Sequence, residues 1–471
     1  MAGWGLCKGV GGLSVSTTAC AGWLLVAQPV LADTLEGALV LAYQNNPTLN
    51  AQRASVRATD EGVPQALAGY RPRVSFNGSV GPQYTDFNAR DRTFMPNYQQ
   101  LSGTMTPRNY GLTATQTLYN GFQTPNRTRQ AESQVQAARE TLRVAEQGTL
   151  LNAVTAYMNL LRDSAILDLQ RRNVEVLQEQ LRQTRDRFNV GEVTRTDVAQ
   201  SESRLAAGRS QVLSAEATYK ASVATYRQVI GVEPGRLAPG APVDRFSPST
   251  QAASIGVGTA THPAVTSAQY NVDAALLQVK VAEGALYPTL ALQGNVQQAY
   301  ETTLLQLRNF NASLIGQLTV PIYQGGAEYS LIRQAKETLG QRRLDLDTAR
   351  DQVRQSIVQA WGQLEAAKAN IEATQAQVQA AEIALNGVRE EARVGQRTTL
   401  DVLNAQQELV NARVALVSAQ RDRVVASYTL LSAVGRLSPQ VLGLRVPVYD
   451  ANVHYQQVRD VWAGMRTPDG R

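Results

Sequence analysis

The clearest pattern in the chain is a seven-residue hydrophobic repeat that runs through two long stretches without proline, residues 126–188 and 328–392. Each apolar position of the first stretch has a counterpart 204 residues later in the second. Repeats of seven sustained over this length predict helices packed side by side with a left-handed twist. We therefore expect two helices of roughly 90 to 100 Å each. The repeat positions are Ala153, Leu160, Leu167, Val174, Leu181 and Phe188, and then Ile357, Leu364, Ile371, Val378, Leu385 and Ala392.

The repeat resumes in shorter segments that end near Val229 and Val434. The pattern V-G-x-x-T-x-x-D-V separates the long segment from the short one in both copies, at residues 190–198 and 394–402. Glycine is favoured just after a helix end, and Thr followed three positions later by Asp predicts a capping box. Each copy is thus interpreted as a hairpin tip between two helices. The residues that the tips share are Val190, Gly191, Thr194, Val394, Gly395 and Thr398.

The hydrophobic period changes from helical to two after Pro72 and Pro288. Helices that open at Pro47 and Pro263 are expected to end there. In the strands that follow, one row is apolar and the other holds small uncharged polar residues, as in a barrel wall between lipid and water; a half-buried soluble sheet gives the same alternation. The longer first connection, residues 86–108, is predicted to be an exposed loop. Strands are predicted at about 73–85, 109–119, 289–300 and 311–322.

Four strands are too few to close a barrel, so several chains must share one, and three chains would supply twelve strands. The predicted fold class is mainly α with a small β part, built by tandem duplication. The repeats span residues 33–230 and 261–435. The Pro- and Gly-rich linker 231–260 and the tail 436–471 are expected to form a belt around the middle of a helical rod. We expect the tail after Tyr455 to be partly disordered.

Residues 1–32 hold one charge, an apolar run and a small-residue cleavage site, which predicts a secretory signal peptide. Both cysteines lie in it, so the remaining chain would have no disulfide and no thiolate metal site. A lipid anchor at Cys20 is the alternative, although residues 17–19 lack the usual leucine. No later stretch has 18 consecutive apolar residues, so entry into a membrane would require strands.

The formal net charge of +6 is spread along helices that also carry Asp and Glu. A basic run with interleaved aromatic residues is missing, which argues against nucleic-acid binding. The two histidines, His262 and His454, stand far in sequence from any nucleophile or second ligand, and Gly256 and Gly258 lack the context of a nucleotide loop. The sequence therefore predicts neither an enzyme nor a metal or cofactor site.

The tandem tips, the proline before each first strand, and the L-Y-N-G and I-Y-Q-G turns into the long helices together resemble the TolC family of outer-membrane channel proteins. The resemblance covers nearly the whole chain after residue 32. It implies a homotrimer whose twelve strands cross the outer membrane, in contact with its lipid, and whose helices form a tunnel in the periplasm. It further implies that a periplasmic adaptor docks at the tips and that an inner-membrane transporter supplies drugs, small molecules or proteins for efflux or type I secretion.

By position, the resemblance implies that Arg397 closes the tunnel by bonding Thr196 and Asp197 on a neighbouring helix pair. Asp401 corresponds to the first of two acidic rings inside the constriction. Asn404 stands where the second acid is usual, and Ala392 where a tyrosine joins the closing network. These departures leave cation binding and the tightness of closure open. The alternative for Asp197 and Asp401 is a purely structural role as helix N-terminal acids.

A protein of another class fits the same pattern, namely a soluble or surface-attached coiled-coil protein, such as a structural spacer or an adhesin. In that case the short strands would only pack together. Association with the outer membrane separates the two hypotheses. The sequence does not identify the cargo, the adaptor or the transporter.

Overall fold

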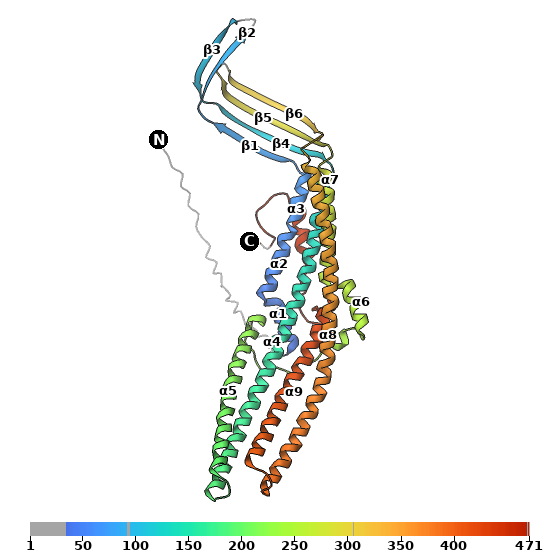
Figure 1. The fold of residues 1–471 in the computed structure, drawn as a ribbon. Helices are drawn as coiled ribbons and strands as arrows, with labels where there is room; N and C mark the ends of the chain where they lie inside the picture. The colour runs from blue at the N-terminus through green and yellow to red at the C-terminus, as the bar shows by residue number, and fades with distance from the viewer. Residues whose placement is uncertain (1–33, 92–94, 305, 469, 471) are drawn as a thin grey trace, which may run out of the picture.

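The computed structural model describes residues 34–91, 95–304, 306–468 and 470. The predicted signal peptide and both cysteines lie outside the described residues. Figure 1 shows a sheet at one end of a long helical rod, with two helical hairpin tips at the other end. The sequence pattern thus places strands and tips at opposite ends of the molecule.

The rod is built on two helices of 67 residues each, α4 (Gln123–Asn189) and α8 (Ala327–Arg393). At 1.5 Å per residue each is about 100 Å long, so the predicted long helices are confirmed. Two shorter helices, α5 (Arg195–Ile230) and α9 (Thr399–Ala433), return from the tips to the middle of the rod. The half of the rod near the sheet is completed by α7 (Pro263–Gly284) and by α2 (Pro47–Asp60) with α3 (Gly62–Leu67).

The seven-residue repeat forms the contacts within each hairpin. Leu160 and Ile357 are fully or almost fully buried, and Leu181 and Leu385 are buried farther toward the tips. Leu385 packs with Leu409 of α9 in one cluster, as expected for helices wound around each other. The last position, Phe188, is exposed beside the first tip. The repeat therefore holds α4 to α5 and α8 to α9 along the half of the rod below the middle.

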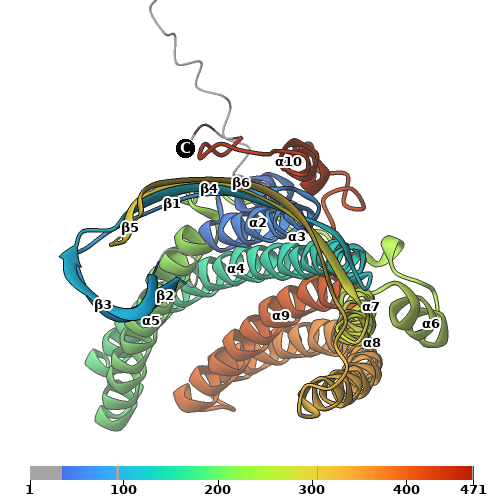
Figure 2. The ribbon, with the colours of Figure 1, turned by 90° about the horizontal axis from the view of Figure 1, so that it is seen from above.

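The main sheet has the order β1-β4-β5-β6 and is antiparallel throughout. Its strands are β1 (Arg73–Val80), β4 (Arg108–Asn120), β5 (Thr289–Thr303) and β6 (Gln306–Thr319). All four predicted strands contribute to this sheet, the first of them only with residues 73–80. It is a curved wall with free edges at β1 and β6, and it continues the curvature of the helices below it (Figure 2).

The connection 86–108 is not the predicted loop. Apart from residues 92–94, which the structure does not describe, it forms a second antiparallel pair, β2 (Gln83–Asp91) with β3 (Met95–Met105). The expected first strand, 73–85, is accordingly two strands that separate at Gly81 and Pro82. The hairpin was missed because main-chain pairing, unlike a half-buried face, does not require alternating apolar side chains.

The helix expected from Pro47 to the start of β1 is also interrupted. Helix α2 ends at Asp60, α3 begins at Gly62, and a 3-10 turn covers Ala68–Tyr70. Gly62 and Pro64 explain the break, since glycine lowers helix stability and proline lacks the N–H donor of a helix interior.

The linker and the first part of the tail, up to Ala451, pack around the middle of the rod together with α1 (Leu35–Asn45), and the rest of the tail leads toward the sheet. Val243 of the linker and Leu437 of the tail belong to one buried cluster with Leu150 and Tyr157 of α4. The Tyr157 hydroxyl donates to the carbonyl of Ala238 at 2.6 Å. Burial of this cluster joins segments that are far apart in sequence.

Both irregular segments contain helices that the sequence did not predict. The linker ends in α6 (Gln251–Thr261), and the tail contains α10 (Ala451–Val458). Helix α6 packs against α8 so closely that a Cβ atom at Gly258 would stand 2.3 Å from the Cδ1 atom of Ile357. Glycine at this position therefore permits the contact, and tertiary packing overrides its low helix propensity.

Candidate functional site at the helical tips

The two tips have the same backbone. Long helix α4 is followed by Gly191 with φ +80°, and α8 by Gly395 with φ +79°. The N–H of Glu192 donates to the carbonyl of Arg187 at 2.9 Å, and that of Gln396 to the carbonyl of Glu391 at 2.9 Å. These bonds close each long helix with a Schellman turn, in which a left-handed residue reverses the chain.

Each returning helix starts with a complete capping box, as the sequence predicts. In the first tip, the N–H of Thr194 donates to Asp197 Oδ2 at 2.9 Å, and the N–H of Asp197 donates to Thr194 Oγ1 at 3.3 Å. Thr398 and Asp401 make the same bonds at 3.0 and 3.2 Å. Both aspartates therefore satisfy free N–H groups at a helix start.

The ion pairs of the two tips are reversed in polarity. In the first tip the cation, Arg187, is on the long helix, and it bonds Glu192 in the turn at 3.0 Å. In the second tip the anion, Glu391, is on the long helix, and it bonds Arg397 in the turn at 2.8 Å. All four side chains are about half exposed, so these pairs contribute little to stability. The ion pairs instead determine the orientation of each charged side chain.

A groove of about 510 Å³ lies between the tips. Among the residues that line it are Arg187, Glu192 and Asp197 from the first tip, and Ala392 and Arg397 from the second. It is also lined by Val193, Thr194, Gly395, Thr398 and Val402, and by further side chains of α4 and α8. Charges of both signs thus face each other across a shared groove.

The structure places the predicted site residues at one end of the rod, although not all in one cluster. Asp197 and Arg397 line the same groove, while Thr196 is exposed on the first turn of α5 and Val190 and Val394 are exposed at the helix ends. Within one chain the partner of Arg397 is Glu391. The bond of Arg397 to a neighbouring helix pair stays a prediction.

The second tip shifts the pKa of its ionisable groups. The carboxylate of Glu391, first by a hydrogen bond and then by its charge, raises the pKa of Arg397 above its usual value. The main-chain N–H of Thr398 and then its hydroxyl lower the pKa of Asp401, with a smaller effect from the charge of Arg397. Both residues are therefore charged over the physiological pH range.

Asn404 contacts the other hairpin. Its side-chain oxygen accepts a hydrogen bond from Arg204 Nη2 of α5 at 2.7 Å. Nearby, Leu403 of α9 is buried against Leu177, Leu181 and Leu205 of the first hairpin. Asn404 stands where the family pattern has an acid. Here it is an uncharged hydrogen-bond acceptor between the two hairpins.

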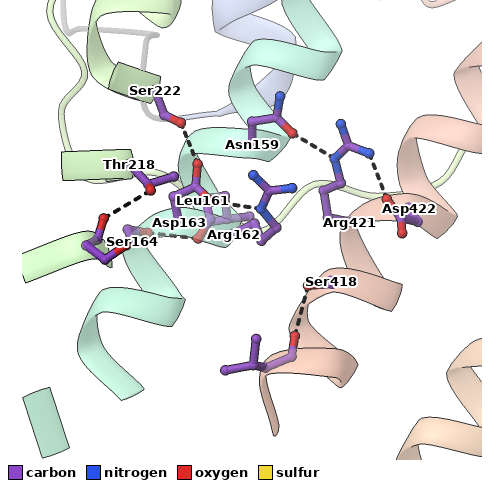
Figure 3. A network of polar contacts seen from close by, with 12 residues as sticks. Asn159, Leu161, Arg162, Asp163, Ser164, Thr218, Ser222, Ser418, Arg421 and Asp422 are labelled. Atoms are coloured by element: carbon purple, nitrogen blue, oxygen red, sulfur yellow. Dashed lines mark hydrogen bonds and ion pairs between the residues drawn. The ribbon is translucent and has the colours of Figure 1, made fainter. Parts of the chain in front are cut away.

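Farther up the rod the two hairpins meet through polar side chains (Figure 3). Arg421 of α9 donates from Nε to Asn159 Oδ1 of α4 at 2.8 Å. Gln406 of α9 contacts Asn173 of α4 at 3.5 Å. Asp163 of α4 is buried and accepts from the Ser222 hydroxyl of α5. The seam between the hairpins thus combines polar contacts with apolar ones such as that of Leu403, and the Asp163–Ser222 bond is a polar contact within the first hairpin.

Sequence reasoning missed Glu391, Glu192 and Arg204. A Schellman turn brings the third residue from a helix end close to the residue after the glycine. Opposite charges five or six positions apart across V-G, as in Arg187–Glu192 and Glu391–Arg397, were therefore a usable signal. No sequence signal links Arg204 to Asn404, because their contact depends on how two hairpins pack.

Within the described ranges, no three His, Cys, Asp or Glu residues are grouped so that they could hold a metal ion. A search of the same residues for a helix long and apolar enough to cross a membrane finds none. His454 instead bonds the buried carboxylate of Asp60, with 3.0 Å between Nδ1 and Oδ2.

Comparison with known proteins gives consistent results over almost the whole chain. A family model described as outer membrane efflux protein matches residues 38–232 and 259–436. The outer membrane efflux protein BepC of Brucella suis is 44% identical over 451 residues, which cover 96% of this chain and 96% of that protein. The outer membrane protein TolC of Escherichia coli is 26% identical over 427 residues, or 87% of this chain and 84% of that protein.

A solved structure shares the fold. The Campylobacter jejuni CmeC outer membrane channel aligns with a TM-score of 0.74 at 17% identity, and the alignment covers 90% of this chain and 89% of that one. The resemblance to TolC-type channels is confirmed. The alternative of a spacer or adhesin from another class is not supported.

Proposed function

Because this chain belongs to the outer membrane efflux protein family, we propose that three copies of it assemble into a closed-ended exit duct that an adaptor opens at the tips. The chain is an outer-membrane channel protein that extends into the periplasm and acts in efflux or type I secretion. Trimer formation, the adaptor and the gate are the parts that we propose.

The proposal of a trimer rests on the free edges of the main sheet. Strands β1 and β6 each have one unpaired edge, and open edges are not tolerated in hydrocarbon. Pairing β6 of one chain with β1 of the next would give twelve strands and leave no edge. Phe76 and Val80 on β1 and Leu314 and Leu318 on β6 are more than half exposed in the single chain, as lipid-facing residues would be.

The gate is proposed at the groove between the tips. Arg397 there has two possible carboxylate partners: Glu391 in its own tip, and Asp197 beside Thr196 of a neighbouring helix pair. We infer that the closed duct uses the second partner and that spreading the tips returns Arg397 to Glu391. The hydrogen bond between Arg204 and Asn404 does not oppose this movement strongly, since it can be exchanged for bonds to water at small net free energy.

The cargo is proposed to be small molecules, with export of a protein as the alternative. The relative that is 44% identical is named for efflux, whereas relatives named for protease secretion are 26 to 27% identical. An adaptor pull-down from cells, followed by identification of the co-purified transporter, distinguishes the two.

The proposal is tested with the full-length protein from outer membranes. A trimer that dissociates on heating is expected on gels, and a low conductance in planar bilayers. Arg397→Ala and Asp197→Ala should each raise the conductance, since each removes one side of the latch. Arg182→Ala is the control, because Arg182 makes only an exposed pair with Glu179 on α4. A monomer in solution contradicts the duct, and an unchanged conductance in both latch variants contradicts the gate alone.

A further inference from the structure

The segment that follows α10 carries large apolar side chains to the base of the sheet. Val461 is 49% exposed, Trp462 71% and Met465 fully exposed. Arg71 holds the segment in place: its Nη1 atom donates to the carbonyl of Val461 at 2.7 Å, and its guanidinium lies 4.7 Å from the centre of the Trp462 ring. Arg71 stands two residues before β1, so Trp462 lies just below the sheet.

Helix α10 gives this segment a fixed starting point. His454 bonds Asp60 of α2, which has no exposed surface, and Val458 is buried. Arg139 of α4 donates to Asn452 Oδ1 at 2.6 Å, and its guanidinium lies 5.1 Å from the centre of the Tyr455 ring. Two helices of the rod therefore hold α10, and the chain beyond it leaves from a defined place.

The segment lies on the side that lipid would surround. Figure 2, a view along the rod from the sheet end, shows α10 and the C-terminal segment on the convex side of the curved sheet. In a closed barrel the convex side is the outside. Large apolar side chains that are exposed close together are uncommon on protein that faces only water, and here they lie below strand β1, whose Phe76 and Val80 are exposed in the same way.

The charges of the segment suit an anionic surface. From residue 459 to residue 471 the sequence has Arg459, Arg466 and Arg471 against Asp460 and Asp469, and Arg71 adjoins the segment. Tryptophan and arginine are side chains that settle at a membrane interface, the first through its amphipathic ring and the second through a long apolar stem with a charged end.

We propose that residues 461–466 form an interfacial anchor that binds phospholipids of the periplasmic leaflet of the outer membrane. Trp462 lies among the headgroups, Met465 reaches the upper acyl chains, and Arg466 with Arg71 faces the phosphates. The inference rests on the proposed position of the sheet in the outer membrane. A short interfacial segment binds membranes only weakly alone, so its role is to fix the height and orientation of a barrel that is already inserted.

The test uses the small number of tryptophans. Of the four in the chain, Trp4 and Trp23 lie in the predicted signal peptide, and the others are Trp361 and Trp462. In full-length Trp361→Phe protein from outer membranes, Trp462 reports alone once the signal peptide is removed. The protein is placed in nanodiscs of phosphatidylethanolamine and phosphatidylglycerol with acyl chains brominated near the carbonyl end or near the methyl end.

Lipid brominated near the carbonyl end is expected to reduce Trp462 fluorescence by about twofold, and lipid brominated near the methyl end to reduce it less, as for an interfacial ring. Trp462→Phe is the matched control. The remaining Trp361 lies about 50 Å along α8 from its sheet end and should be quenched by neither lipid. Arg466→Glu should weaken the quenching of Trp462 as the share of phosphatidylglycerol rises.

Fluorescence of Trp462 that neither brominated lipid changes, in protein that co-purifies with nanodiscs, would overturn the anchor and leave the barrel in the membrane. Shielding of Trp462 from the aqueous quencher acrylamide without quenching by lipid would overturn it as well, because the segment would then be covered by protein. Failure to enter nanodiscs at all would instead contradict the membrane position of the sheet.

Discussion

The two tips of the rod have one backbone design and opposite arrangements of charge. Both use a left-handed glycine, a Schellman turn and a Thr–Asp capping box with nearly equal bond lengths. Their ion pairs differ, because the first tip has its arginine on the long helix and the second has its arginine in the turn. Local helix chemistry accounts for what the tips share and does not account for what distinguishes them.

The difference between the two tips separates two roles of the V-G-x-x-T-x-x-D-V motif and its neighbours. The shared residues determine the shape of each tip, and changes to them should affect both copies alike. The unlike residues determine which charges enter the groove, and changes to them should affect the copies differently. Asp197 and Asp401 are shared residues that cap their helices, and each is also a predicted gate residue.

Substitution of the two tip glycines is expected to have the largest effect on stability, and the same effect at both tips. Gly191→Ala and Gly395→Ala should each destabilise their tip by about 1 to 2 kcal/mol, because a side chain disfavours the left-handed conformation. A Cβ atom would meet nothing within 4 Å at either position, so the whole effect is backbone strain. Hydrogen exchange of the tip amides measures it. Gly387→Ala within α8 is the control and should stabilise its helix. Different losses at the two tips would refute a common backbone role.

Removal of the capping side chains is expected to have a smaller effect on stability, again the same at both tips. Thr194→Ala and Thr398→Ala should each speed hydrogen exchange in the first turn of α5 or α9 by an amount that corresponds to about 1 kcal/mol. Serine at either position retains a hydroxyl acceptor and should restore most of the protection. If alanine and serine behave alike, the side-chain bonds seen in the structure do not stabilise these helix starts.

The smallest effect is expected from protonation of the Asp401 carboxylate at acid pH. The pKa of Asp401 is lowered below its ordinary 3.8 by the N–H and hydroxyl of Thr398. A carboxylate with a lowered pKa in the folded state stabilises that state above its ordinary pKa and loses the effect as the pH falls through the lowered value. The second cap should therefore persist until the pH is below 3.8. A carbon-13 titration of the Asp401 carboxyl measures this, and Thr398→Val should shift the midpoint upward; a midpoint of 3.8 or higher without the substitution excludes the bonds in solution.

Much of the fold was predictable because its signals are local and repeated. The seven-residue repeat, the prolines before the strands and the V-G turns each specify an element without reference to distant residues. The β2–β3 hairpin, α6 and α10 were not predictable in this way. Helix α6 contains Gly256 and Gly258 and forms because it packs on Ile357, and α10 is held by Asp60, which is almost 400 residues away in sequence.

The site was predictable to a similar extent. The capping boxes and the common position of the tips followed from the motif. The pairing of Arg397 with Glu391 depends on the geometry of the turn, and that of Asn404 with Arg204 depends on the packing of two hairpins. The latch needs Asp197 of one tip and Arg397 of the other, so it is encoded in neither tip alone.

The most direct test of the latch is the conductance of the exchanged variant Glu391→Arg with Arg397→Glu in planar bilayers. The exchange keeps an ion pair within the second tip but places a carboxylate opposite Asp197. If Arg397 closes the duct by bonding the neighbouring helix pair, the exchanged protein should conduct several times better than the unmodified protein, because like charges then face each other. A conductance equal to that of the unmodified protein would show that the pair within the tip is sufficient, and would contradict the latch.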